Sequence, residues 1–158
     1  MSYQPLSRPY SFIVAKGFGD YATSLKTKER FETGDMLAPI TGIPSVARNY
    51  ATLQCGPADH DNLQLDSDLI YTNHSCDPNT VWDMSSDNPS EWHVRATRTI
   101  AEGDEITFFY PSTEWEMSQP FACHCGAGVR NLSQRLSQTL TRMSVMPRGY
   151  QGRHRSVA

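Results

Sequence analysis

Asn73-His74-Ser75-Cys76-Asp77-Pro78-Asn79 is the stretch that decides how this chain of 158 residues is interpreted. Asn, Ser and Asp carry short polar side chains that bond to nearby backbone groups and draw the chain out of regular structure. Pro78 has a fixed φ angle and biases Asp77 towards an extended conformation. Apolar runs flank the heptad at 69–71 and 80–82. The pattern predicts a tightly self-bonded loop, which is more typical of a functional site than of a simple connection.

The heptad resembles the signature of SET-domain methyltransferases, which transfer a methyl group from S-adenosylmethionine to a lysine side-chain amine. Three other blocks occur in the order that this family shows: the glycine pair in Ala15-Lys16-Gly17-Phe18-Gly19, a closing segment over 92–110, and the start of a cysteine-rich post-SET tail over 121–126. The resemblance covers roughly residues 10–126. It implies a mostly β, β-clip-like fold of small curled sheets, with a pseudo-knot where the tyrosine-bearing strand passes the heptad loop.

The hydrophobic pattern by itself also indicates a mostly β protein. Short apolar or alternating runs predict strands at 11–15, 50–54, 92–97 and 105–110. The C-terminal segment differs, because its apolar residues follow helical spacing and predict an amphipathic helix; they are Val129, Leu132, Leu136, Leu140 and Met143. We therefore expect a SET domain with the start of post-SET over 1–126, a helical segment over 127–146 and a disordered tail over 147–158. This helix is expected to pack on the body, with a dimer face or a lid as alternatives.

The resemblance implies a role for individual residues. Tyr110 corresponds to the catalytic tyrosine, and Phe108 occupies the position where Phe permits multiple methylation and Tyr stops at one. Asn73 and His74 are expected to hold the amino-acid end of the cofactor. The full set of expected cofactor-binding residues is Lys16, Gly17, Phe18, Gly19, Asn73, His74, Tyr110 and Phe121. The expected substrate channel is lined by Tyr71, Phe108, Tyr110 and Trp115.

The chemistry explains why aromatic residues suit such a channel. Methyl transfer from a sulfonium is an in-line displacement, and holding two reactants in line can contribute ~7–11 kcal/mol. The acceptor amine must arrive neutral, although the pKa of a lysine side chain is ordinarily about 10.4. An apolar channel that ends at a cationic sulfur disfavours the ammonium form by desolvation and by like charge.

The cysteines leave the presence of zinc open. Relatives with a zinc-bound post-SET tail carry the pattern C-x-C-x4-C, and the heptad cysteine completes four thiolates. Cys76, Cys123 and Cys125 match that pattern, but Arg130 stands where the last cysteine is expected. Structural zinc strongly prefers four protein ligands. Either His124 or Cys55 completes the site, or these are reduced thiols of a degraded site, and the second interpretation is slightly favoured.

Charge and hydropathy limit the partners. Residues 1–116 hold all 17 acids and 8 of the 14 Lys and Arg, which leaves a net charge of −9, whereas 117–158 carries six arginines and no acid. The arginine-rich tail is expected to lie on the acidic body or in solvent. The alternative is an acidic groove that attracts a basic protein or peptide substrate; its candidates are Asp59, Asp61, Asp66 and Asp68. Nucleic-acid binding is weakly supported, because the arginines lack interleaved aromatic residues.

No apolar run approaches the length of a membrane span, and the first ten residues lack the layout of a signal peptide. A cytoplasmic or nuclear location is expected on these grounds. Two functional alternatives remain open beside a lysine methyltransferase. One is a SET-like module that binds a peptide or partner without methyl transfer, and the other is a SET enzyme with a non-lysine or small-molecule acceptor. A Cys76–His74 nucleophile carries little weight, because no third group is placed to orient the base.

Overall fold

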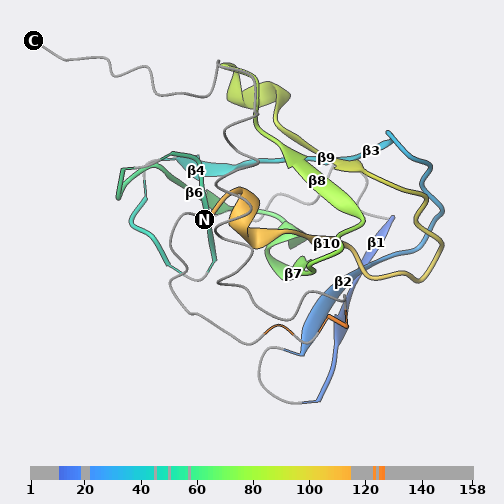
Figure 1. Ribbon diagram of the computed structural model, residues 1–158. Helices are drawn as coiled ribbons and strands as arrows, with labels where there is room; N and C mark the ends of the chain where they lie inside the picture. The colour runs from blue at the N-terminus through green and yellow to red at the C-terminus, as the bar shows by residue number, and fades with distance from the viewer. Residues whose placement is uncertain are drawn as a thin grey trace, which may run out of the picture.

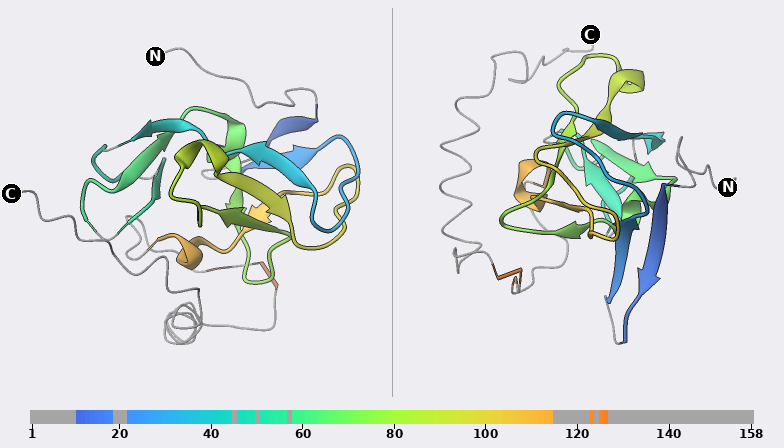
Figure 2. Two further views of the ribbon diagram at one scale, coloured as in Figure 1. Left: turned by 90° about the horizontal axis from the view of Figure 1, so that it is seen from above. Right: turned by 90° about the vertical axis from the view of Figure 1, so that its right-hand side faces the viewer.

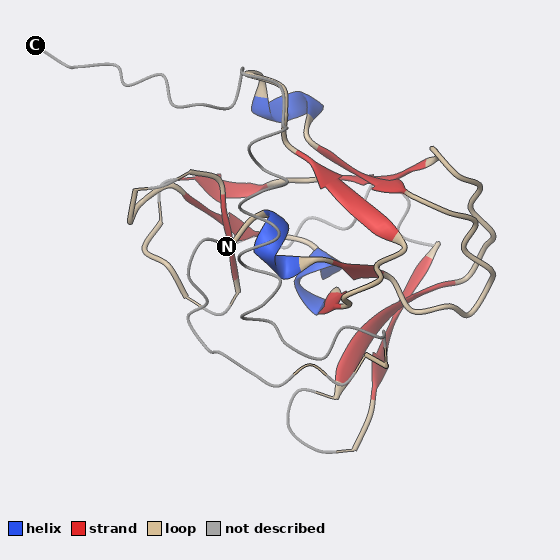
Figure 3. Cartoon of the chain, in the orientation of Figure 1, coloured by secondary structure: helices blue, strands red, loops and turns tan. Residues whose placement is uncertain are grey.

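The computed structural model describes residues 11–18, 22–44, 46–49, 51–56, 58–114, 123, 125 and 126. These residues form four small sheets and three 3₁₀ turns, and no α-helix occurs among them. Figures 1 and 3 show the larger sheets arranged around a short central pair of strands, β7 and β10. The mostly β expectation is therefore confirmed. The helix predicted over 127–146 and the tail over 147–158 lie outside the described residues.

The first sheet is an antiparallel hairpin of β1 (Phe12–Lys16) and β2 (Thr23–Thr27). It projects from the rest of the described chain in the right-hand view of Figure 2. The Gly17 amide donates to the Ala22 carbonyl over 2.8 Å at the end of the hairpin. A Cβ atom on Gly17 would lie 2.7 Å from that oxygen, a distance that real Cβ atoms essentially never show. Glycine is therefore required here for the close approach of two backbone segments.

Two antiparallel sheets of three strands form most of the body. One has the order β3 (Met36–Pro39), β9 (His93–Ala96), β8 (Thr80–Asp83), with a register shift between Met36 and Ala38. The other has the order β4 (Gly42–Pro44), β6 (Asn62–Leu65), β5 (Thr52–Gln54). The predicted strands at 11–15, 50–54 and 92–97 are confirmed as β1, β5 and β9.

The fourth predicted strand, 105–110, is shorter than expected. Its paired part, β10, covers Thr107–Phe108, and the chain turns into the 3₁₀ segment η3 (Tyr110–Ser112). The amides of Thr113 and Glu114 donate to the Tyr110 carbonyl, at 3.0 and 2.9 Å. Proline follows Tyr110 in the sequence and has no N–H to give to a sheet. The strand therefore ends before the tyrosine, which takes its position from a turn. The other two 3₁₀ segments are η1 (Asp68–Tyr71) and η2 (Pro89–Glu91).

The core lies between the hairpin, the β3-β9-β8 sheet and β10. Its most deeply buried side chains are Leu25, Phe31, Val94, Ile100 and Ile106. Isolated bridges join Phe31 to Ile100 and Lys26 to Glu105. The segment that leads into β10 is thereby fastened to the hairpin before it reaches β7. No helix among the described residues is long and apolar enough to span a membrane.

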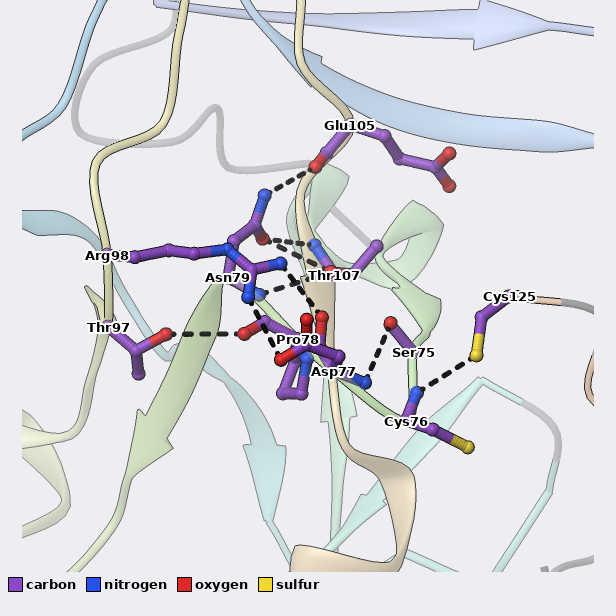
Figure 4. Close-up of polar contacts among 10 residues, drawn as sticks. All are labelled: Ser75, Cys76, Asp77, Pro78, Asn79, Thr97, Arg98, Glu105, Thr107 and Cys125. Atoms are coloured by element: carbon purple, nitrogen blue, oxygen red, sulfur yellow. Dashed lines mark hydrogen bonds and ion pairs between the residues drawn. The ribbon is translucent and has the colours of Figure 1, made fainter. Parts of the chain in front are cut away.

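The central pair joins β7 (Asn73–His74) to β10 in parallel. Side chains of the heptad strengthen this short contact, as Figure 4 shows. Asn79 donates through Nδ2 to the Glu105 carbonyl over 2.8 Å, and its Oδ1 accepts the Thr107 amide at 2.9 Å. Within the loop, the Asp77 amide donates to the Ser75 hydroxyl at 3.1 Å. The heptad is thus self-bonded as predicted, and the segment before Tyr110 passes beside it as the resemblance implies.

We predict that Asn79→Ala destabilises the whole fold. The substitution leaves the Thr107 amide and the Glu105 carbonyl without their partners beside β10, where Asn79 itself is 8% exposed. The expected loss is ~2–4 kcal/mol in the free energy of unfolding, because each buried group left unsatisfied costs ~1–3 kcal/mol. Urea denaturation measures this loss. Asn88→Ala removes the same atoms at an exposed cap of η2 and is the control, with an expected loss of at most about 1 kcal/mol.

Candidate active site

Both ends of Tyr110 are held by the segment that contains β7. Its backbone amide donates to His74 Nδ1 over 3.2 Å, and its hydroxyl donates to the Thr72 carbonyl over 2.9 Å. The Ser75 amide also donates to the Phe108 carbonyl at 3.0 Å. The position of the phenol therefore follows from the parallel pairing of β7 and β10.

Aromatic rings surround Tyr110. The Phe108 ring lies between Trp82, at a centroid distance of 4.4 Å, and Tyr110, at 4.7 Å. The His74 ring lies 5.3 Å from Tyr110 and 5.6 Å from Phe109. Phe108 is buried, so it belongs both to the core and to the wall beside the tyrosine. Aromatic neighbours of this kind are what a channel for a lysine methylene chain requires.

The Asn73 side chain joins the hairpin to the segment before β10. Its Nδ2 donates to the Thr23 carbonyl at 3.0 Å and to Glu105 Oε1 at 2.8 Å. Thr23 pairs with Lys16 in the hairpin, so the end of the hairpin that carries Gly17 lies near Asn73. The structure thus brings two of the blocks recognised in the sequence to one place.

The other predicted residues are placed less centrally. Phe18 follows the hairpin strand and is fully exposed. Tyr71 ends η1 directly before Thr72, and its partly buried ring packs against the core. Gly19, Trp115 and Phe121 lie outside the described residues. Sequence reasoning missed the structural roles of three residues, Thr23, Thr72 and Glu105, because each acts through a contact between distant parts of the chain and has no distinctive local pattern.

Burial controls the protonation of the groups around the phenol. Burial, and then the nearby carboxylates of Glu114 and Glu105, raise the pKa of Tyr110 to about 12. Burial also raises the pKa of Glu114 to about 7, although the charge of Arg48 opposes the shift. The phenol is therefore neutral across the physiological range, and Glu114 changes its charge near neutral pH.

The polar atoms around Asn73 fit the amino-acid end of S-adenosylmethionine. Both hydrogen bonds of the Asn73 side chain described above are donated by Nδ2. Within the described residues, Oδ1 of Asn73 makes no hydrogen bond. The buried Thr72 hydroxyl also has no partner there. Glu105 adds a carboxylate directly beside Asn73. Two oxygen acceptors and a negative charge suit an ammonium group, so the donor set is compatible with this cofactor.

The structure also brings the predicted sulfur ligands together. Cys76 Sγ lies 3.8 Å from Cys123 Sγ and 3.4 Å from His74 Nε2. The Cys76 amide donates to Cys125 Sγ over 3.3 Å, as drawn in Figure 4. Burial, and then the neighbouring Cys123 and Cys125 thiols, raise the pKa of Cys76 to about 12. Cys55 does not belong to this group of sulfur ligands. It lines a cavity elsewhere on the protein. His124 lies outside the described residues.

Two surface features lie beside this arrangement. A polar cavity of about 490 Å³ is lined by residues that include Ser75, Glu105 and Arg98. Asn73, His74 and Tyr110 do not line it, so it is not where the site residues converge. In the predicted acidic groove, Asp61 already accepts the Ala58 amide and Asp66 accepts the Thr41 hydroxyl. Attraction of a basic substrate by this groove stays a prediction.

Comparison with known proteins covers two of the sequence blocks, the heptad and the closing segment over 92–110. The SET domain family matches residues 20–111. The chain is 43% identical over 122 residues to "Methyltransferase flvH" of Aspergillus flavus, and the match covers 77% of this chain and 66% of that protein. It is 38% identical over 58 residues to "Histone-lysine N-methyltransferase ASHH3" of Arabidopsis thaliana, which covers 36% of this chain and 15% of that protein. Over 78 residues it is 33% identical to human "Histone-lysine N-methyltransferase 2D", which covers 49% of this chain and 1% of that protein. The chain therefore spans less than two thirds of each of these relatives.

A solved structure supports the fold. KRYPTONITE in complex with mCHG DNA and SAH matches with a TM-score of 0.57 and 19% identity. The match covers 74% of this chain and 27% of KRYPTONITE. At this identity the likeness concerns the arrangement of the strands, and it agrees with the sheets described above.

We predict that Glu114→Gln stabilises the protein at alkaline pH. Burial raises the pKa of Glu114 from its ordinary value of 4.5 to about 7. The stability that goes with the neutral carboxyl is complete below about pH 4.5 and is lost as the pH rises through about 7. Glutamine stays neutral, so the variant is expected to exceed the wild type by ~1–3 kcal/mol at pH 8 and to match it near pH 4.

Chemical denaturation at several pH values measures this difference. Glu102→Gln, which removes the same charge at an exposed turn, is the control. A difference for Glu114→Gln that is constant across the pH range would contradict the assignment of a half-buried carboxyl beside Tyr110 that becomes charged near pH 7.

Proposed function

The chain belongs to the SET-domain family, and on that premise we propose that it transfers a methyl group from S-adenosylmethionine to a lysine side-chain amine of a protein. The observation that carries the proposal is the convergence of Asn73, His74 and Tyr110 through the pairing of β7 with β10. The histone-lysine methyltransferases among the relatives support a protein lysine as the acceptor.

The residues of the site have separate proposed roles in binding the cofactor and in contacting its methyl group. S-adenosylmethionine, when bound, supplies an electrophilic methyl group on a cationic sulfur. Asn73 Oδ1 and the Glu105 carboxylate would bind its ammonium group, as their position beside the hairpin allows. Tyr110 donates a hydrogen bond to the Thr72 carbonyl, which leaves the lone pairs of the phenol oxygen to accept weak C–H···O contacts from a methyl group.

The neutral state of Tyr110 matters for the acceptor amine. A phenolate would stabilise the ammonium form of lysine, which cannot attack a methyl group. Because the pKa of Tyr110 is raised to about 12, no such charge is present at physiological pH. The Phe108 ring adds apolar surface beside the phenol and no charge or hydroxyl. This wall disfavours the ammonium by desolvation and so promotes the neutral amine.

A different nitrogen acceptor is the second candidate. Of the three relatives described above, the Aspergillus protein matches the largest share of this chain, and its name specifies a methyltransferase with no acceptor. A small amine or a non-lysine nitrogen fits the same cofactor contacts, since these do not involve the acceptor. Assays with protein mixtures and with small amines, run in parallel, distinguish the two.

We predict that Tyr110→Phe abolishes methyl transfer while the protein keeps its fold and its cofactor affinity. The variant loses the hydroxyl that the Thr72 carbonyl orients, and retains the ring that packs on Phe108. The expected fall in kcat is at least about 100-fold, which corresponds to ~2.7 kcal/mol in the activation free energy. Transfer of labelled methyl to core histones and to a lysine-containing peptide library measures kcat.

Tyr71→Phe is the matched comparison, because it removes a hydroxyl from the other described tyrosine of the expected channel. Its expected effect on kcat is less than about tenfold, since Tyr110 alone has its hydroxyl assigned to the reacting groups. Equal activity of Tyr110→Phe and wild type on any acceptor would rule out the role proposed for Tyr110.

We further predict that the wild type forms di- or trimethylated product and that Phe108→Tyr stops at one methyl group. The added hydroxyl would enter a buried position between Trp82 and Tyr110, where it restricts the room for a methylated amine. Mass spectrometry of the product under excess cofactor measures the number of methyl groups added. Monomethyl product alone from the wild type would show that Phe108 does not permit multiple methylation here.

A further inference from the structure

The carboxyl group of Glu114 lies on the same side of a turn as the active-site tyrosine. Glu114 follows η3, and its amide donates to the Tyr110 carbonyl over 2.9 Å. This bond closes one helical turn, in which residues four apart are neighbours on one face. The charge of Glu114 accordingly acts on the Tyr110 phenol. Within the residues that the structure describes, the half-buried Glu114 carboxyl accepts no hydrogen bond, so its oxygens are available to a ligand.

The other carboxylate that acts on the phenol is already occupied. Glu105 accepts the Asn73 side-chain amide at 2.8 Å, on the side of the site where the cofactor is expected. The charged group that acts on Glu114 itself is the exposed Arg48, from the segment after β4, and it favours the carboxylate form. The phenol beside Glu114 is neutral at physiological pH. Of the two carboxylates near Tyr110, Glu114 is therefore the one suited to the acceptor.

The placement of Glu114 costs stability, which a purely structural role does not explain. Burial raises the pKa of Glu114 to about 7, so at neutral pH part of the population carries a charge that the surroundings stabilise poorly. A general base works best when its pKa lies near the working pH, and carboxyl groups perturbed in this way are typical of functional sites.

We propose that Glu114 is the general base of the reaction: it binds the ammonium group of the acceptor beside Tyr110 and removes one proton before methyl transfer. The inference rests on the function proposed above. One N–H bond of the ammonium breaks, its electron pair stays on nitrogen as the attacking lone pair, and the proton forms an O–H bond on Glu114. The half-buried carboxyl then releases the proton to solvent. Each further methylation repeats this step, because transfer to an amine yields an ammonium again.

The site makes this proton transfer easier than it is in water. There it is unfavourable, since the ordinary pKa of a lysine side chain is about 10.4. The aromatic wall beside Tyr110 disfavours the ammonium, and burial disfavours the carboxylate, so one proton transfer removes two poorly solvated charges. The carboxylate thus attracts the acceptor without keeping it in the charged form that cannot attack.

The pH dependence of kcat/KM separates a base from a structural residue. With the best acceptor among core histones and the peptide library, we expect the wild-type value to rise with pH through about 7, where Glu114 loses its proton. Glu114→Gln is expected to lower kcat/KM by at least about 100-fold at neutral pH, although it is the more stable protein at alkaline pH. The deficit should shrink towards about pH 10, where the amine loses its proton in solution. Glu102→Gln, at an exposed turn, is expected to follow the wild type.

A second measurement needs no methyl transfer. The side-chain carboxyl ¹³C resonance of Glu114, assigned through Glu114→Gln, reports the pKa of this group. We expect n-butylamine, which carries the reacting end of a lysine side chain, to lower the pKa of Glu114, because a bound ammonium favours the carboxylate. n-Butanol, which has the same chain and no charge, is the control and is expected to leave this pKa unlowered.

Two results would overturn the proposal. One is a Glu114→Gln variant that keeps the wild-type kcat/KM and its pH dependence, and the other is a pKa of Glu114 that n-butylamine does not lower. A protein that methylates no acceptor, but whose Glu114 responds to n-butylamine as expected, would refute the methyl transfer and support the amine-binding role of Glu114.

Discussion

The parallel contact between Asn73–His74 and Thr107–Phe108 is the constraint on which the rest of the site depends. Two residues on each side make a weak sheet by themselves, since short strand pairs are marginal in water. The Asn79 side chain compensates, because it bonds to both backbone groups that flank the start of β10. Once β10 is fixed beside β7, Tyr110 reaches both the Thr72 carbonyl and the His74 ring. Fold and site are therefore stabilised by the same few hydrogen bonds.

Local patterns in the sequence predicted the parts of the fold that local chemistry controls. The heptad was recognisable as a loop from its polar side chains and proline, and three strands from their apolar alternation. The end of β10 was not predicted correctly. Aromatic residues continue to Tyr110 and favour a strand there, but the proline that follows imposes a turn. The partners of Asn73 could not be predicted at all, because Thr23 and Glu105 approach it only after the hairpin and β10 have packed.

His74 connects two regions of different chemistry. One ring nitrogen accepts the Tyr110 amide and the other lies beside Cys76 Sγ, so the imidazole stands between the tyrosine and the sulfur cluster. A substitution at this position changes the support of Tyr110 and the surroundings of Cys76 at the same time. Loss of activity in a His74 variant therefore cannot be assigned to a cofactor contact alone. Variants of Asn73, whose bonds lie on the hairpin side, report on the cofactor end more directly.

Calorimetric titration of the folded protein with S-adenosylmethionine tests the central claim, that the β7–β10 contact assembles a working cofactor site. The account predicts saturable binding of one molecule per chain. It also predicts that Asn73→Ala weakens the affinity by at least about tenfold, or ~1.4 kcal/mol, while Asn88→Ala, at the exposed cap of η2, leaves it unchanged. Absence of binding by the folded wild type, or equal binding by Asn73→Ala, would contradict it.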